Sequence, residues 1–160
     1  MNFSDRVKKY LENTYRFLSI RSRSEKEIRD YLKKKQAEQE IIEHIVELLK
    51  KQKFLDDLVF ARSWVLSRAR SRPKGKSAVK FELLQKGVAK EIVEKVLTEE
   101  NEELPDQVTQ ATRLIEKRVE KLKDASRQEI YNKVGSFLAR RGFDWDTIKQ
   151  SIDEVLKNRV

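Results

Sequence analysis

Three copies of one helical pattern account for most of this sequence of 160 residues. In each copy a leucine precedes a turn by four residues, and the helix after the turn carries two apolar residues one helical turn apart. The turns fall at Gln36, Gly87 and Gly142, which are 51 and 55 residues apart. Glycine suits two of these turns because it readily enters the left-handed conformation that ends a helix. The pattern predicts an all-α chain made of three tandem three-helix repeats.

Each repeat is short, and this limits how it can be stable. A three-helix unit of about 50 residues is marginally stable alone, so we expect each unit to bury an open face on its neighbour. We predict repeats at residues 1–52, 53–100 and 101–160, stacked into an elongated, curved array. The acidic stretch at residues 99–106 is the expected linker between the last two repeats.

Local signals agree with helices and disfavour a sheet. Ser24 with Glu27, and Ser126 with Glu129, have the spacing of a helix-capping box. Pro105 suits the first turn of the helix that follows it. With 4 glycines and 2 prolines, the chain has few residues for the tight hairpin turns of a sheet-rich fold.

The residue types exclude most catalytic chemistry. The chain has no cysteine, and its one histidine, His44, lies inside a predicted helix. Residues 75–77 (GKS) are like the end of a phosphate-binding loop, but that loop needs a glycine where this chain has Arg70. The pair at residues 56–57 (DD) is better explained as the cap and first-turn acid of a helix than as a metal site. We therefore expect no enzyme activity, no catalytic residue, no cofactor and no metal.

The sequence contains no segment that directs it to a membrane. No run approaches the roughly 20 apolar residues of a membrane helix. The first residues also lack the apolar core of a signal peptide. We expect a cytoplasmic, monomeric protein that does not contact a membrane.

Positive charge is concentrated in the first 100 residues. The 36 basic and 27 acidic residues give a net charge of +9, and residues 1–100 carry +8 of it. Residues 62–86 hold eight basic residues and one acid, and residues 16–35 hold eight basic residues and three acids. Such clusters are typical of surfaces that bind a polyanion or an acidic protein. A merely solvated face is the alternative.

We place the binding surface around the bend at Pro73 and Gly75. These residues interrupt the helical run, so the basic side chains beside them are expected to splay outward. The corresponding turn of the first repeat follows three consecutive lysines. The predicted partner-binding or DNA-binding residues are Arg21, Arg23, Lys33, Lys34, Lys35, Arg68, Arg70, Arg72, Lys74, Lys76 and Lys80.

The aromatic residues Phe60 and Trp64 recur at helical spacing among these arginines. Such spacing is more typical of a protein core than of a platform on which bases stack. We therefore assign the two aromatic side chains to the core and the flanking arginines to the surface.

Three stretches of the sequence carry motifs: residues 18–28 (LSIRSRSEKEI), 54–68 (FLDDLVFARSWVLSR) and 82–88 (ELLQKGV). In order and spacing these motifs resemble those of the RecX family of regulatory proteins. The third repeat resembles the family through its Arg141-Gly142 turn and its apolar pattern. The resemblance implies three tandem three-helix repeats and no enzyme activity.

The resemblance also implies a partner, the bacterial recombinase RecA. RecX proteins bind RecA, lie along the groove of its filament on single-stranded DNA, and block filament growth, strand exchange and ATP hydrolysis. This would give the chain a role in homologous recombination, DNA repair and the SOS response. Two alternatives stay open from charge alone: a free-standing DNA-binding protein whose basic helices contact phosphates, and a scaffold that binds another acidic protein.

Overall fold

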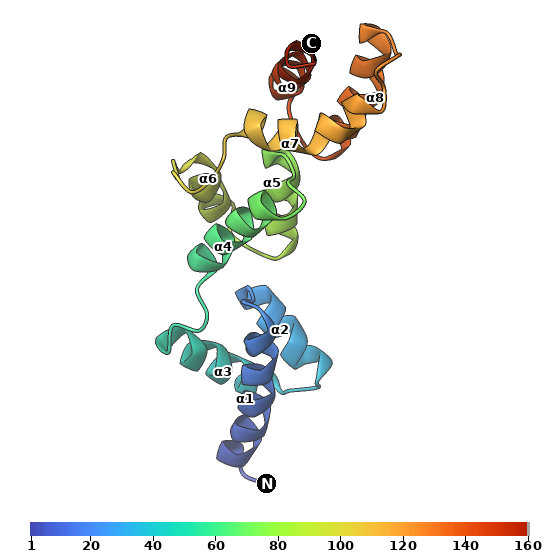
Figure 1. The fold of residues 1–160 in the computed structure, drawn as a ribbon. Helices are drawn as coiled ribbons and strands as arrows, with labels where there is room; N and C mark the ends of the chain where they lie inside the picture. The colour runs from blue at the N-terminus through green and yellow to red at the C-terminus, as the bar shows by residue number, and fades with distance from the viewer. Residues whose placement is uncertain (160) are drawn as a thin grey trace. The chain divides into compact units, whose positions relative to one another are not determined.

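The computed structural model describes residues 1–159, and every element of regular structure within them is a helix (Figure 1). The helices are α1 (Phe3–Ile20), α2 (Glu25–Lys34), α3 (Gln39–Lys51), α4 (Asp57–Arg70), α5 (Lys76–Gln85), α6 (Lys90–Thr98), α7 (Gln107–Glu120), α8 (Arg127–Arg140) and α9 (Trp145–Lys157). The prediction of an all-α chain is confirmed. Residues 99–106 lie between α6 and α7, where the linker is expected.

The helices assemble into two compact units. The first unit comprises Met1–Ser63 and Leu83–Val96, and the second comprises Trp64–Glu82 and the chain from Leu97 onward. Helices α4 and α5 of the middle repeat therefore contribute to both units. The repeat borders at residues 52 and 100 stay a proposal.

The core of the first unit is built from α1, α2 and α3. Ile28, Leu32, Ile41 and Ile45 are almost completely buried, and Tyr10 of α1 packs against them. These are the isoleucines and the leucine that the repeat pattern assigns to the buried faces of α2 and α3. Apolar burial is the main favourable term in folding, so this face holds the three helices together.

The core of the second unit is built from α7, α8 and α9. Ile115, Leu138 and Ile152 are completely buried at its centre. Pro105 lies just before Asp106, which is the N-cap of α7, so the prediction that places this proline in the first turn is wrong. The side-chain hydrogen bond that an N-cap supplies comes from the aspartate, which leaves proline outside the helix.

Local hydrogen bonds begin the helices as the sequence predicts. The Ser24 hydroxyl accepts from the Glu27 backbone, and the Glu27 carboxylate accepts from the Ser24 backbone, which completes a capping box. Ser126 caps α8 with its hydroxyl, which accepts from the backbone N–H of Glu129 at 3.2 Å, and this is the serine half of the predicted capping box.

The three predicted turn residues all adopt the left-handed conformation. Their φ values are 66° at Gln36, 76° at Gly87 and 90° at Gly142. After each turn residue, the next backbone N–H donates to the carbonyl of the repeat leucine: Ala37 to Leu32 (3.0 Å), Val88 to Leu83 (3.1 Å) and Phe143 to Leu138 (3.2 Å). The shared closing bond is the structural basis of the repeat.

Two of these turns accept a hydrogen bond from the preceding repeat. In the first unit, the Ser24 hydroxyl donates to the Lys86 carbonyl at 2.6 Å. In the second unit, the Gly75 N–H donates to the Arg141 carbonyl at 2.7 Å. A Cβ atom on Gly75 would lie 2.1 Å from the carbonyl oxygen of Gly142, so this close backbone approach requires glycine.

The turn of the first repeat accepts a hydrogen bond from within its own repeat. The carbonyl of Lys35 accepts instead from the Tyr10 hydroxyl of α1, at 3.4 Å. Gln36 is exposed, so its side chain has room in solvent. A Cβ atom on Gly87, by contrast, would lie 2.5 Å from the Cβ of Lys26. This difference explains why only the first of the three turns holds a residue other than glycine.

Candidate partner-binding surface

In the first unit, Glu27 gathers basic groups around its carboxylate. Arg21 Nη2 lies 2.5 Å from Glu27 Oε2, and Lys86 Nζ lies 3.5 Å from the same oxygen. Burial alone would raise the pKa of Glu27, but hydrogen bonds from Arg21 and from the Ser24 backbone hold it below its usual value. The carboxylate therefore stays ionised and offsets much of the charge of Arg21.

Arg23 is part of the packed interior instead of an open surface. Its guanidinium lies over the ring of Phe17, 3.8 Å from the ring centroid, and its side chain is 11% exposed. Burial lowers the pKa of Arg23. The contact fixes the end of α1 against the segment that leads into α2, so this arginine contributes mainly to the fold.

In the second unit, Glu82 of α5 has a similar set of partners. Trp64 Nε1 and Arg68 Nε donate to Glu82 Oε2 at 2.7 and 2.8 Å, and Lys74 Nζ lies 2.8 Å from Oε1. Burial alone would raise the pKa of Glu82, but the hydrogen bonds from these three side chains hold it below its usual value. Arg68 and Lys74 are thus paired with a carboxylate that is only 14% exposed.

The aromatic pair of α4 divides between the core and this carboxylate cluster. Phe60 is buried, as the sequence predicts, whereas Trp64 is half-buried. The Trp64 indole N–H is bound to Glu82, and the guanidinium of Arg68 lies 5.1 Å from the centroid of its ring. These contacts tie Trp64 into the fold.

The lysines of the first repeat remain accessible. Lys33, Lys34 and Lys35 are exposed at the end of α2, and none lies within ion-pair distance of a carboxylate in residues 1–159. Lys35 Nζ lies 5.7 Å from the ring centroid of Tyr31. Cations at a helix C-terminus are favourable for the helix, so this cluster is compatible with a stable α2.

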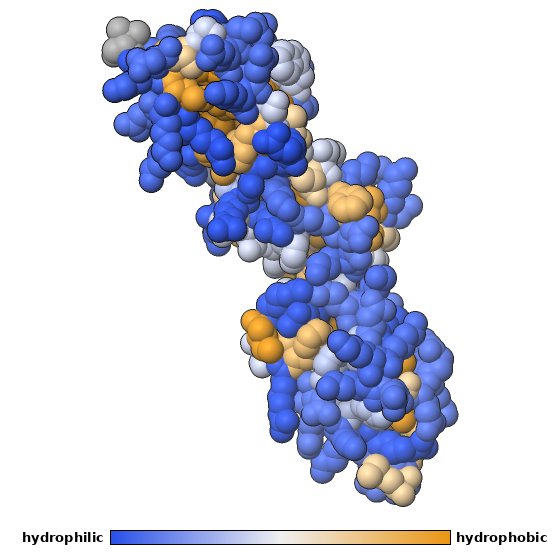
Figure 2. Space-filling model, turned by 90° about the vertical axis from the view of Figure 1, so that its right-hand side faces the viewer, coloured by the Kyte–Doolittle hydropathy of each residue, from blue (hydrophilic) through white to orange (hydrophobic). Residues whose placement is uncertain are grey.

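The bend of the middle repeat also presents accessible basic side chains. Arg70, Arg72 and Lys76 are exposed, and Lys80 is half-buried. Arg70 lies 3.8 Å from Glu103, whereas the other three make no ion pair with any described carboxylate. We call Lys33, Lys34, Lys35, Arg70, Arg72 and Lys76 the accessible basic residues. The face of the molecule drawn in Figure 2 is mostly hydrophilic, with a few apolar patches.

Other potentially reactive side chains have structural surroundings. His44 is exposed on α3, and no group of three metal-ligating side chains occurs in the described part of the chain. The Asp56 carboxylate caps the start of α4, and Asp57 accepts from the backbone of Glu25 at 2.9 Å. The predicted roles of these two aspartates at a helix start are confirmed. None of the helices described here is long and apolar enough to cross a membrane.

Comparison with known proteins assigns the chain to a family. Models of the first, second and third three-helix domains of RecX match residues 12–49, 56–97 and 105–152. The regulatory protein RecX of Prosthecochloris aestuarii is 37% identical over 158 residues, which cover 99% of this chain and 100% of that protein. The chain belongs to the RecX family. The resemblance noted from the sequence motifs is thereby confirmed, as is the prediction of three tandem three-helix repeats.

Further RecX proteins agree with this assignment. RecX of Bacillus pumilus is 34% identical over 155 residues, which cover 97% of this chain but 58% of that protein. The chain therefore spans little more than half the length of this relative. The crystal structure of RecX from Lactobacillus salivarius matches with a TM-score of 0.83 at 26% identity, covering 97% of this chain and 99% of that one. A second RecX crystal structure matches with a TM-score of 0.78 at 25% identity, covering 94% and 74%.

The predicted binding residues include both paired and accessible basic side chains, and sequence reasoning did not separate them. The Arg68 side chain donates a hydrogen bond to Glu82, 14 residues away in the sequence, and Lys86 donates to Glu27, 59 residues away. Contacts at such separations leave no local pattern. The one available signal is that Glu82 is the single acid in the basic stretch 62–86.

Proposed function

We propose that this RecX-family protein binds the filament that the RecA recombinase forms on single-stranded DNA, and that it inhibits filament assembly, ATP hydrolysis and strand exchange. The observation that carries the proposal is the match of all three RecX domains in chain order, together with relatives named regulatory protein RecX. In this proposal the protein acts by binding in the bacterial cytoplasm, as a monomer, and catalyses no reaction.

The repeat architecture supports a mechanism of inhibition. Tandem repeats give one chain several contact surfaces that are connected covalently, so binding at one surface favours binding at the next. A chain that spans neighbouring RecA subunits competes with the rearrangements between them that ATP hydrolysis and filament growth require. The accessible basic residues are the candidates for contacts with acidic RecA surfaces or with DNA phosphates.

A second candidate function is free-standing DNA binding. It is supported by the same exposed lysines and arginines, because phosphate contacts need only accessible positive charge. The two functions differ in where the protein acts. Excess free DNA competes for a protein that binds DNA alone, whereas a protein that recognises the RecA filament stays bound to the filament.

RecA's DNA-dependent ATP hydrolysis separates the two functions. The assay uses the protein at a sub-stoichiometric ratio to RecA, first with limiting and then with excess single-stranded DNA. We expect the rate of ATP hydrolysis to fall by a similar factor in both conditions, because the inhibitor remains on the filament. Inhibition that disappears with excess DNA would instead support the DNA-binding function.

A further inference from the structure

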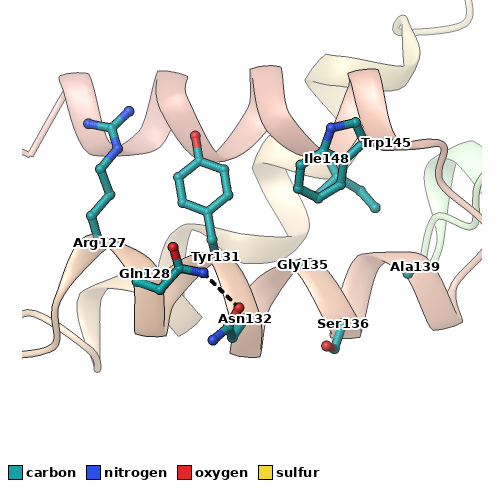
Figure 3. A pocket seen from close by; sticks show the side chains of 9 residues that line it. All are labelled: Arg127, Gln128, Tyr131, Asn132, Gly135, Ser136, Ala139, Trp145 and Ile148. Carbon is teal, nitrogen blue, oxygen red and sulfur yellow. Dashed lines mark hydrogen bonds between the residues drawn. The ribbon is translucent and has the colours of Figure 1, made fainter.

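A groove of about 760 Å³ runs between α8 and α9 in the second unit (Figure 3). Its size lies within the range of roughly 300–1,000 Å³ that is typical of sites for ligand-sized groups. Tyr131 points from α8 toward α9, and Trp145 and Ile148 come from α9. Aromatic and apolar side chains from two helices therefore line the groove, together with polar side chains of α8: Arg127, Gln128, Asn132 and Ser136.

Gly135 of α8 lines this groove and contributes no side chain to it. It is buried inside α8 with an ordinary right-handed backbone, so no turn requires glycine here. A Cβ atom at this position would touch only Ile148 Cγ2, at an ordinary distance of 3.6 Å. Glycine in a helix interior costs about 1 kcal/mol relative to alanine. Neither backbone conformation nor crowding calls for glycine here, so a small side chain would fit at this position and only a long one would fill the groove.

One aromatic wall is fixed in place, and the other is displayed to solvent. The Tyr131 hydroxyl donates to the Asp153 carboxylate, which also accepts from Arg127 Nη2 at 2.8 Å. Trp145, in contrast, is 62% exposed at the start of α9. Tryptophan, tyrosine and arginine are the residues that most often dominate binding at protein interfaces. A pre-positioned ring beside an exposed indole is a favourable place for an incoming apolar side chain.

The charges around the groove disfavour a nucleic acid as its occupant. Asp146, beside Trp145, is exposed, whereas the Asp144 carboxylate caps α9 by accepting from the Thr147 backbone. Arg127, a charged side chain in the lining of the groove, is paired with Asp153. Residues 101–160 carry 12 basic and 11 acidic side chains, unlike the strongly basic first 100 residues. A phosphate backbone would meet an arginine that is already paired with Asp153 and no excess of positive charge around it. An apolar side chain with a basic neighbour complements the same surface.

We propose that the α8–α9 groove is a docking site for a protein segment that inserts a large apolar side chain between Tyr131 and Trp145 and places a basic residue near Asp146. The inference rests on the proposed function, under which this segment belongs to RecA. Under this proposal, the basic first and middle repeats contact polyanionic or acidic surfaces. The third repeat binds a protein partner through its groove.

The test measures binding of the full chain to RecA filaments on single-stranded DNA and, separately, to an oligothymidylate without RecA. Trp145→Ala removes one wall, and Gly135→Leu fills the groove from its floor. We expect each change to weaken filament binding by roughly tenfold or more, as for other interface residues of this kind. Binding to the oligothymidylate is expected to stay within about twofold of the unchanged chain.

Two matched variants control for side effects. Phe81→Ala removes an aromatic ring of similar exposure, 64%, from α5, and is expected to leave filament binding within about twofold. Gly135→Ala alters the same position without filling the groove, and is also expected to bind normally.

Four outcomes contradict the proposal in distinguishable ways. If Trp145→Ala and Gly135→Leu bind filaments like the unchanged chain, the groove is not the docking site, although the proposed function stands. If Phe81→Ala weakens binding as much as Trp145→Ala, the loss of binding comes from removing exposed apolar surface in general and not from altering the groove. If oligothymidylate binding falls equally, the occupant is a DNA base. If the unchanged chain does not bind filaments at all, the proposed function fails and this inference fails with it.

Discussion

Replacing Gly142 by alanine is expected to lower the free energy of unfolding by about 2–5 kcal/mol. The change introduces both a strained left-handed backbone at a residue with a Cβ atom and a steric clash of that atom with α5. Gly142 has a φ of 90°, a region in which a residue with a Cβ atom is disfavoured. The added Cβ would also lie 2.5 Å from the Cβ of Ala78 and 2.6 Å from its backbone nitrogen. The backbone of α5 cannot yield without disturbing the contact between Gly75 and this turn. Urea unfolding followed by far-UV circular dichroism measures the loss.

Gly135→Ala is the matched control for this substitution. Its Cβ would make only an ordinary contact, and alanine is the better helix former, so the variant is expected to be unchanged or more stable by up to about 1 kcal/mol. If Gly142→Ala proves as stable as Gly135→Ala, the close approach of α5 to the turn after α8 does not exist in solution.

Reversing the charge of Lys33, Lys34 and Lys35 to glutamate, or of Arg70, Arg72 and Lys76 to glutamate, is expected to weaken filament binding by roughly tenfold or more. These side chains are accessible, and their ion pairing is absent or, for Arg70, weak, so their charge is available to a partner. If all three side chains of a triplet contact phosphates, the slope of log K against log salt concentration becomes less negative by about 2 in the variant. The melting temperature is expected to change little, because exposed charges contribute little to stability.

The control is the same reversal at Lys117, Lys121 and Lys123, which are exposed in the nearly neutral third repeat. This variant changes net charge by the same amount and is expected to bind within about threefold of the unchanged chain, because long-range charge effects are screened over about 8 Å in physiological salt. Equal losses in all three triplets would mean that total charge, and not the accessible basic residues, decides binding.

Sequence reasoning predicted the helices and the repeat because their signals are local. Leu32, Leu83 and Leu138 are buried, and each carbonyl closes a left-handed turn at the fourth residue after it. A capping serine with a glutamate three residues later needs only one turn of chain to act. Such features can be read from any short stretch of the sequence.

The candidate surface was less predictable because its chemistry depends on contacts between distant residues. Arg68 and Lys74 are as basic in the sequence as Arg72 and Lys76, and only the fold brings Glu82 beside the first two. Gly75 is a second residue whose role depends on a distant contact. In the sequence it belongs to an accidental match to a phosphate-binding loop, whereas in the structure its missing side chain lets two backbones meet.

The growth rate of RecA filaments on single-stranded DNA distinguishes regulation through the filament from binding to free DNA. Growth is followed on individual DNA molecules while this protein is present at a small fraction of the RecA concentration, with free single-stranded DNA added as a competitor. If the protein regulates RecA by binding its filament, filament growth slows or stops and the competitor DNA does not restore it. Growth at the unchanged rate, or growth restored by the competitor, would contradict regulation through binding to the filament.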